Sequence, residues 1–363
     1  MIGLNNPIGY KSIQHLQKPF IINPFRFSSG GGIGGWIELG RTTLGGSAAT
    51  MAVSGLADKK YYMVLINSIC SGLVFHNIQF NSDTGNNYAY RYSDNGGGDG
   101  TLAPNTSTLF GSGGSTTQSF SVGYIANLTG QEKLVAANGM NQSSAGSGTA
   151  PARRETVGKW VPVTASDVID EFVLANGAGG NLDTGSEVVV LGWDPDDEHT
   201  DNFWEELASV NESSGQLDSL AFTAKKYLWI QAWLKPASGT WNGEVRVGNT
   251  TIDTGTNYAN RQSGNGGTDA TSTNVDKLFN SNGISSIDQF VNIFIINNAS
   301  NEKLAIGHSV EARTLGASTA PDRNEMVGKW NNTSNQMDRI SISKTSGSGV
   351  MDSTSILKVW GHD

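Results

Sequence analysis

The sequence predicts an all-β fold in which two tandem homologous antiparallel β-sandwich domains follow an extended N-terminal arm. Three observations support this fold class. A long segment of the chain is repeated at a fixed offset, the composition favours turns and short strands, and no window of the 363 residues carries the apolar stripe of a helix. The chain has 46 Gly and only 16% charged residues, whereas helical proteins are rich in Glu, Lys, Leu and Ala.

The repeat consists of two blocks in the same order. The segment DTGNNYAYRYSDNGGGD at 83–99 returns as DTGTNYANRQSGNGGTD at 253–269, and TAPARRETVGKW at 149–160 returns as TAPDRNEMVGKW at 319–330. Both pairs are offset by 170 residues (253 − 83 = 170), and no gap is needed between the blocks. Because the matched positions hold Trp, Arg, Tyr and Gly in fixed order, we interpret the repeat as a duplicated domain.

The ends of the repeat set the domain boundaries. WIEL at the start of the first module corresponds to WEEL in the second, and the closing segments VVVLGWD and LKVWGHD also correspond. The resulting division is an arm at 1–35, module A at 36–194, an acidic linker at 195–203 and module B at 204–363. Two large copies are expected to pack side by side as two domains.

Alternating apolar residues predict strands in both modules. They lie at 61–69, 74–80, 120–127 and 186–193 in module A, and at 227–234, 243–249, 289–297 and 355–361 in module B. The Gly/Asn/Ser-rich segments 94–118 and 138–150 are expected to be long loops. With about 160 residues per module, a two-sheet sandwich of jelly-roll topology is the expected arrangement.

Charge and cysteine content argue against several functions. A formal net charge of −9 argues against binding nucleic acid, because phosphate recognition requires clustered Lys and Arg. The only cysteine, Cys70, lies beside an apolar run and is expected to be a buried, unreactive thiol. No apolar stretch is long enough for a membrane span. The N-terminus lacks the apolar core of a secretory signal, so we expect synthesis in the cytoplasm, unless a leader was removed before Met1.

Several residues of the first repeated block are expected to have structural roles. Tyr88 and Arg91 recur as Tyr258 and Arg261, and in each copy an Asn-Gly-Gly sequence follows. Asn-Gly is a strong hairpin signal because both residues tolerate positive φ. The aspartate that opens each DTG triplet is a natural start for an Asx turn. Turn formation is therefore the main interpretation of this block.

A calcium loop is the alternative interpretation of the same block. Its ligands would be the nearby carboxylates, namely Asp83, Asp94 and Asp99 in module A and Asp253 and Asp269 in module B. Calcium takes six to eight oxygen ligands. The second copy has Gly264 in place of Asp94, so it lacks one ligand. We therefore expect no cofactor, with Ca²⁺ as the one candidate.

An Arg-x-Glu sequence precedes Val-Gly-Lys-Trp in both modules. The residues are Arg153, Glu155 and Trp160 in module A and Arg323, Glu325 and Trp330 in module B. An internal ion pair that holds a loop, with the tryptophans as core anchors, is the favoured interpretation. The alternative is a site for a glycan or a carboxylate, because arginine binds carboxylates in a bidentate way and tryptophan stacks on sugars.

The sequence contains no recognisable catalytic set, and we predict that the protein is not an enzyme. The five histidines are scattered, and none occupies the same place in both modules: His15, His76, His199, His308 and His362. Metal-ligand spacing, a nucleophile elbow and a phosphate-binding loop are all missing from the sequence.

The N-terminal arm has the composition of a docking segment. Residues 1–35 contain three basic residues and no acid, and the Gly-rich segment 30–35 is expected to act as a flexible hinge. Within KPFIINPFRF, apolar and basic side chains alternate with proline: Lys18, Phe20, Phe25, Arg26 and Phe27. Such a segment is expected to become ordered when it docks on a neighbouring subunit.

Taken together, the module motifs resemble modules in virion structural proteins of marine phages and archaeal viruses. The resemblance rests on Trp36–Arg41, Lys59–Tyr61, Phe80–Gly97, Arg153–Trp160 and Gly185–Gly192. It covers both modules, although module B lacks the Leu-Gly-Arg of the opening motif and the Gly-Ser-Glu before its last strand. The resemblance implies a jelly-roll component of a capsid shell, a capsid decoration or a fibre.

The sequence therefore predicts a self-assembling structural protein of the virion. The expected partners are further copies of the chain and other virion proteins. The alternative is a tandem glycan-binding or receptor-binding protein, which would use the exposed loop aromatics Tyr90, Tyr92 and Trp241. Module B has Asn260 and Gln262 in place of the two tyrosines, which argues against a duplicated sugar site.

Overall fold

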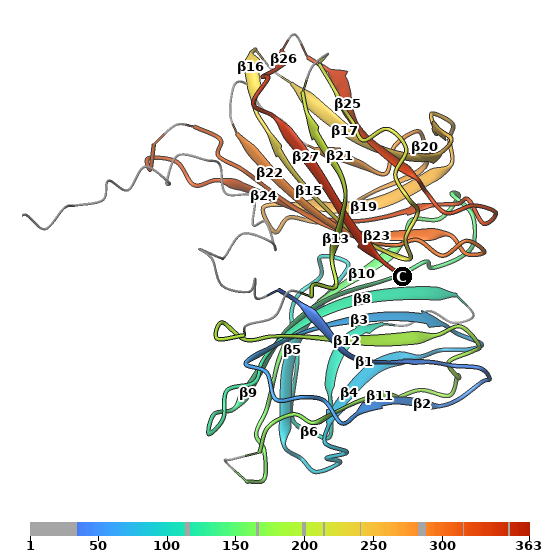
Figure 1. Ribbon diagram of the computed structural model, residues 1–363, viewed down its shortest axis with the longest axis vertical. Coiled ribbons are helices and arrows are strands. Elements are labelled where there is room, and N and C mark those ends of the chain that lie inside the picture. Colours follow the sequence, from blue (N-terminus) through green and yellow to red (C-terminus); the bar gives the residue numbers. More distant parts are fainter. Residues whose placement is uncertain are drawn as a thin grey trace, which may run out of the picture.

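A computed structural model of the chain describes residues 35–112, 117–164, 167–197, 201–212, 215–239, 241–281, 288–314, 316–347 and 349–363 (Figure 1). These residues form the strands β1 to β27 and no helix, so none of the described segments is a helix that could cross a membrane. The paired strands are antiparallel, and their sheets stack as sandwich-like layers. The predicted all-β class is confirmed.

The N-terminal half of the chain forms two sheets. The larger has the strand order β1-β12-β3-β8-β9-β10-β5-β6, and the smaller has the order β2-β11-β4-β7. The strands are β1 (Ile37–Thr43), β2 (Thr50–Ser54), β3 (Tyr61–Ile69), β4 (Phe75–Phe80), β5 (Tyr88–Asp94), β6 (Gly100–Asn105), β7 (Thr108–Ser112), β8 (Gln118–Ala126), β9 (Lys133–Asn141), β10 (Ala152–Trp160), β11 (Glu171–Asn176) and β12 (Glu187–Trp193).

The C-terminal half forms a second large sheet, β13-β27-β15-β22-β23-β24-β19-β20, and a smaller sheet, β14-β25-β17-β18, in which β21 also pairs with β17. A two-stranded ribbon joins β16 and β26. The strands are β13 (Glu205–Asn211), β14 (Leu217–Asp218), β15 (Tyr227–Leu234), β16 (Pro236–Ser238), β17 (Asn242–Asn249), β18 (Thr251–Ile252), β19 (Tyr258–Gly264), β20 (Ala270–Val275), β21 (Phe279–Ser281), β22 (Gln289–Ile296), β23 (Lys303–Glu311), β24 (Asp322–Trp330), β25 (Arg339–Ser346), β26 (Val350–Met351) and β27 (Ile356–His362).

Corresponding strands occupy corresponding places in the two large sheets. In the N-terminal half Trp160 of β10 is the register partner of Tyr88 of β5, and in the C-terminal half Trp330 of β24 is the partner of Tyr258 of β19. Each of these residues is related to its counterpart by the 170-residue offset of the sequence repeat. The repeated blocks therefore form the same local structure twice.

The strand predictions were right for apolar segments and wrong for polar ones. β3 and β15 have the predicted bounds, at Tyr61–Ile69 and Tyr227–Leu234. The segment 94–118, expected to be a loop, contains β6 and β7. The segment 138–150 includes the end of β9, which runs to Asn141. These strands escaped prediction because β6 is a largely exposed edge strand without apolar alternation, and β9 is rich in Ala, Asn and Gly.

The Asn-Gly-Gly sequences form tight turns, as predicted. Asn95 and Gly96 have φ of 50° and 68°, and their counterparts Asn265 and Gly266 have φ of 53° and 71°. Two successive residues with positive φ define the turn that fits the twist of a β-hairpin. Each turn follows directly on β5 or β19 and is closed by a short backbone hydrogen bond.

The two large sheets contribute side chains to apolar cores on both of their faces. Consecutive side chains of a strand point to opposite faces, so the continuous apolar run of β3 serves two cores. Tyr62, Val64 and Ile66 belong to the core between the two sheets of the N-terminal half. Met63 and Leu65 belong to a different core, which they share with residues of the C-terminal half.

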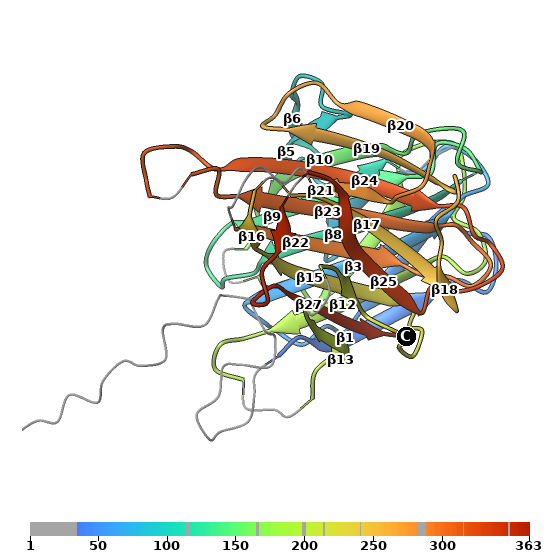
Figure 2. The same cartoon turned by 90° about the horizontal axis from the view of Figure 1, so that it is seen from above.

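This shared core holds the two halves together. It contains the large aromatic side chains Trp204, Trp229, Phe294 and Trp360, whose rings lie 5.3–6.1 Å apart in successive pairs. The halves therefore stack through the faces of their large sheets instead of lying side by side as expected (Figures 1 and 2). Four sheet layers result, with the smaller sheets outermost.

Candidate functional site

The DTG triplets form the same turn in both halves. Trp160 Nε1 donates a hydrogen bond to Asp83 Oδ2 at 2.7 Å, and Trp330 Nε1 donates to Asp253 Oδ2 at the same distance. The backbone N–H two residues after each aspartate, at Gly85 or Gly255, donates at 2.8 Å. Both tryptophans are buried and lie in stacked contact with Tyr88 or Tyr258. Asp83 and Asp253 therefore close a turn and orient a core tryptophan.

The hydrogen bonds of this turn stabilise the ionised aspartate. Burial raises the pKa of Asp83, but the hydrogen bonds from Trp160, Asn87 and Gly85 outweigh it. The pKa of Asp83 consequently lies below its ordinary value.

The carboxylates considered as calcium ligands have separate partners. Asp94 accepts two hydrogen bonds of 2.5 Å from Arg154, and Asp99 pairs with Arg91 at 3.1 Å. Asp83 binds the indole described above, so the three carboxylates do not share one set of donors. Over the described ranges, no group of three His, Cys, Asp or Glu side chains is placed to hold a metal ion.

Arg153 crosses the junction between the halves. Its guanidinium forms a bidentate pair with Asp269 of the C-terminal half, with contacts of 2.8 Å and 3.0 Å, and reaches Glu325 at 3.2 Å. It also pairs with Glu155 of its own strand. The side chains of Arg153 and Asp269 are only 5% and 2% exposed. The ion pair predicted from the sequence thus exists, but it connects the two halves.

A cleft of about 340 Å³ lies beside this ion pair. It is lined by residues of both halves, among them Arg91, Tyr92, Asp99, Glu155, His308 and Glu325. Burial raises the pKa of Glu155 well above its ordinary value, and the neighbouring Glu325 raises it further against the opposing effect of Arg153. Burial also lowers the pKa of His308. No sequence signal indicated His308, because the other module has Asn138 there.

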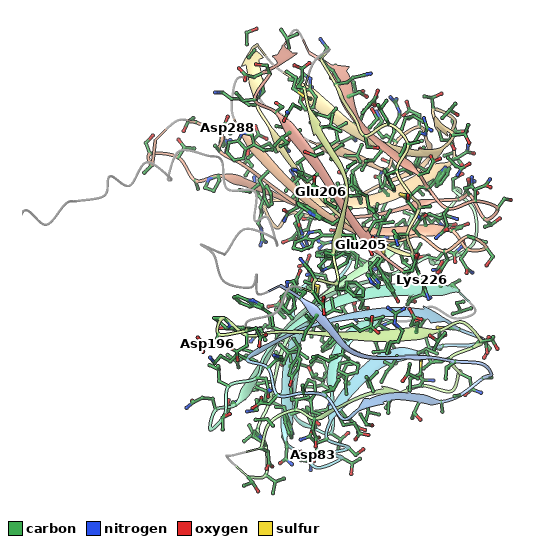
Figure 3. All side chains as sticks on the ribbon, viewed as in Figure 1. Asp83, Asp196, Glu205, Glu206, Lys226 and Asp288 are labelled. Atoms are coloured by element: carbon green, nitrogen blue, oxygen red, sulfur yellow. The ribbon has the colours of Figure 1, made fainter. Side chains whose placement is uncertain are left out.

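A second polar contact joins the halves at the other side of the junction. Lys226 lies at the junction of the two halves (Figure 3) and pairs with the buried Glu187 at 2.9 Å. The hydroxyl of Tyr227 donates to the same carboxylate at 2.9 Å. Burial opposes ionisation of Glu187, but the hydrogen bonds from Thr43, Lys226 and Tyr227 hold its pKa below the ordinary value. Both charged contacts fix the relative position of the large sheets.

An apolar groove of about 370 Å³ opens on the large sheet of the N-terminal half. Its aromatic lining comes from the start of β1, from β3, from β8 and from the end of β12: Trp36, Tyr61, Tyr62, Tyr124 and Trp193. The rings of Tyr61 and Trp193 stack at 5.4 Å, and those of Trp36 and Trp193 lie 6.2 Å apart. Leu134 on β9 is 56% exposed at the edge of the groove.

The loop aromatics proposed for glycan binding have other positions. Trp241 is only 2% exposed and packs in the core of the C-terminal half, so the expectation that it is exposed was wrong. Tyr90 and Tyr92 lie on β5 instead of a loop and are half-buried, and the ring of Tyr92 lies 4.9 Å from the Arg154 guanidinium. The groove instead presents Tyr124, which is 36% exposed, beside the half-buried Trp36, Tyr61 and Trp193. Its residues were missed because they come from segments far apart in the sequence.

The remaining predicted residues are placed as follows. Arg261, the counterpart of Arg91, donates to the carbonyl of Pro151 in the other half at 2.8 Å. Arg323 is 62% exposed and pairs with Glu325 at 3.1 Å. Cys70 is buried, as predicted. The arm residues Lys18, Phe20, Phe25, Arg26 and Phe27 lie outside the described residues.

Comparison with known proteins provides no assignment. No family model and no curated protein matches the chain. Neisserial surface protein A is 8% identical with a TM-score of 0.12, over 81% of this chain and 99% of that one. The paired C2 domains of extended synaptotagmin 2 are 9% identical with a TM-score of 0.16, over 85% and 94%. Human GIVD cytosolic phospholipase A2, solved with methyl gamma-linolenyl fluorophosphonate, is 7% identical with a TM-score of 0.11, over 77% and 33%. Similarities this slight carry no argument about this chain.

Proposed function

We propose that this protein is a non-enzymatic structural component of a virus particle, as capsid shell, capsid decoration or fibre. It would assemble with further copies of itself and with other virion proteins, through its sheet faces and its N-terminal arm. The observation that carries the proposal is the strand order of the two halves, which supports a tandem pair of jelly rolls.

In a jelly roll, eight strands numbered along the chain form two sheets in the orders 1-8-3-6 and 2-7-4-5. In the N-terminal half, β5–β6 and β9–β10 are extra strands at one edge of the large sheet. Without them the orders are β1-β12-β3-β8 and β2-β11-β4-β7, which fit this scheme. The C-terminal half fits it with β13-β27-β15-β22 and β14-β25-β17-β21. Jelly rolls occur in viral capsid and lectin domains.

Two further features support an assembly role. The stacked halves share an apolar core and two buried ionic contacts, which suit a preformed rigid unit. The large sheet of the N-terminal half also presents an open aromatic groove, and contiguous exposed apolar surface is typical of interaction sites. We accordingly propose domains at 36–194 and 204–363, preceded by an assembly arm at 1–35.

The size of the purified full-length protein tests this proposal. Light scattering followed by negative-stain microscopy is expected to show defined oligomers, shells or fibres. Deletion of residues 1–35 is expected to leave a folded protein that assembles less, because the strands β1 to β27 and the three described apolar cores are built from residues after Gly35. A full-length protein that remains monomeric at high concentration would contradict the proposed function.

A tandem glycan-binding protein is the second candidate. The observation in its favour is the stacked pair Tyr61 and Trp193 in the groove, because aromatic faces of this kind bind sugar rings. A glycan array with the full-length protein separates the two candidates. Binding that is lost in Trp193→Ala, by a protein that stays monomeric, would favour the glycan-binding function.

A further inference from the structure

The apolar groove continues the face that joins the two halves. In the register of the large sheet, Met63 on β3 is the partner of Tyr124 on β8. Tyr61 lies two residues before Met63, so its side chain points to the same face. Met63 belongs to the shared core, whereas Tyr124 is 36% exposed in the groove. The C-terminal half thus covers one end of this sheet face and leaves the other end open.

The corresponding surface of the C-terminal half is completely covered. Trp204, Tyr227, Phe294 and Leu304 are the counterparts of Trp36, Tyr61, Tyr124 and Leu134, as the register of both sheets and the sequence repeat show. All four lie in the shared core, with at most 4% exposure. In the N-terminal half Trp36 packs against the edge of the shared core, whereas Tyr124 and Leu134 are 36% and 56% exposed.

We infer that the groove binds the apolar segment 18–27 of the same chain. This inference rests on the proposed role of the arm in assembly and specifies where the arm docks. The segment KPFIINPFRF offers three phenylalanines and an Ile-Ile pair, which match an aromatic groove of about 370 Å³. In the isolated subunit at low concentration the segment occupies its own groove, and its exchange between two copies on assembly would join subunits, as in domain swapping.

The short connection between the arm and the first sheet favours docking of the segment 18–27 in the groove of the same chain. The chain enters the first sheet at Trp36, which itself lines the groove. Trp36 is nine residue steps from Phe27 (36 − 27 = 9), and an extended chain of this length spans about 30 Å. The Gly-rich segment 30–35 can reverse direction because glycine adopts both signs of φ. A tether this short holds the segment at its own groove with an effective concentration in roughly the millimolar range.

The charges of the two partners are complementary. The segment contains Lys18 and Arg26 and no acidic residue. The turn that follows Trp193 at the groove contains three aspartates, at 194, 196 and 197, which pair with the two lysines at 59 and 60 (Figure 3). Asp196 is 84% exposed, so its carboxylate is accessible to a basic side chain. This attraction would orient the segment and would weaken with added salt.

A disulfide cross-link in the full-length protein tests the inference. The variant pairs Phe25→Cys in the arm with Leu134→Cys at the groove edge, where the 56% exposed leucine contributes little to the core. The buried Cys70 remains as it is. Equal amounts of ¹⁵N-labelled and unlabelled protein are mixed at about 1 µM, far below the effective concentration of the tether, and oxidised. Mass spectrometry of the linked peptides then reports which chains are joined.

We expect links only between peptides of the same label. The matched control replaces Leu134→Cys with Leu102→Cys, which places an exposed cysteine on β6 at the opposite edge region of the large sheet, and should give far less product. Links that join labelled to unlabelled peptides would show that the groove takes the arm of another copy, against the inference. Equal yields in variant and control would show that the segment does not dock in the groove.

This result is independent of the particle size measured for the proposed function. Particles without the cross-link would leave the assembly role intact and refute the docking site. A specific cross-link in a protein that never forms particles would retain the docking site and contradict the assembly role.

Discussion

Equivalent residues of the two halves lie in opposite environments. Arg153 is 5% exposed between the halves, whereas its counterpart Arg323 is 62% exposed. Asp269 is 2% exposed, and its counterpart Asp99 is 51% exposed. If the halves were related by a two-fold axis, both Arg–Asp pairs would cross the junction. The duplicated sequence therefore fixes the structure of each half, while the stacking of the halves decides which copy of a residue is buried.

A second ion pair shows the same difference. Lys159 and Glu132 pair at 2.9 Å on the surface of the N-terminal half, with both side chains more than 40% exposed. Their counterparts Lys329 and Glu302 are buried and lie 3.8 Å apart, and Lys329 also donates to the carbonyl of Gln142 in the other half at 3.0 Å. Burial lowers the pKa of Lys329. The Lys159–Glu132 pair faces solvent, whereas Lys329 in the other copy holds a loop of the N-terminal half.

The largest effect is expected from breaking the buried Arg–Asp pair. Arg153→Ala removes the bidentate partner of the buried Asp269, whose remaining cation is Arg261 at 3.6 Å, and should lower the free energy of unfolding by about 3–5 kcal/mol. Arg323→Ala is the matched control and should cost at most about 1 kcal/mol, because the Arg323 side chain is 62% exposed and Glu325 keeps Arg153 as a partner. Chemical denaturation measures both values. Equal losses in the two variants would mean that the halves do not depend on this contact.

A smaller contrast is expected at the two equivalent leucines. Leu304 is completely buried in the shared core, so Leu304→Ala should cost about 2–5 kcal/mol. Leu134→Ala should change stability by no more than about 0.5 kcal/mol, because this leucine is 56% exposed. If the groove is an assembly surface, Leu134→Ala should nevertheless reduce particle size in light scattering. An unfolding penalty as large as that of Leu304→Ala would show that the groove is not open.

The sequence predicted local structure well and the junction poorly. The Trp160–Asp83 turn, the Asn95–Gly96 turn and the bounds of β3 follow from local propensity and alternation, which one copy of the repeat already encodes. The burial of Arg153 does not, because both copies contain Arg-x-Glu, and only the packing of sheet faces distinguishes them. The groove was missed for the same reason: its residues belong to β3, β8, β9 and β12 and meet only in the folded sheet.

The junction should also respond to pH through its paired glutamates. Glu155 of one half lies against Glu325 of the other, with Arg153, Arg323 and the half-buried His308 nearby. Burial and the second carboxylate raise the pKa of Glu155. The folded protein therefore retains a proton that the unfolded chain has released. The stabilisation that protonated Glu155 provides is complete below pH 4.5, the ordinary pKa of a glutamate. It is lost as the pH rises toward the raised pKa of Glu155 in the folded protein.

Glu155→Gln should remove this pH dependence at a small energetic gain. The neutral amide cannot repel Glu325, and Arg153 keeps Asp269 and Glu325 as partners. Because about a third of the Glu155 side chain is exposed, solvent screening limits the gain at pH 8 to roughly 1 kcal/mol. Unfolding measured from pH 5 to 8 should show a flatter profile than the unsubstituted protein, whereas Glu132→Gln on the exposed surface should leave the profile unchanged. A variant that is less stable at pH 8 would mean that attraction to Arg153 outweighs repulsion from Glu325, so that the third carboxylate holds the halves together instead of straining their contact.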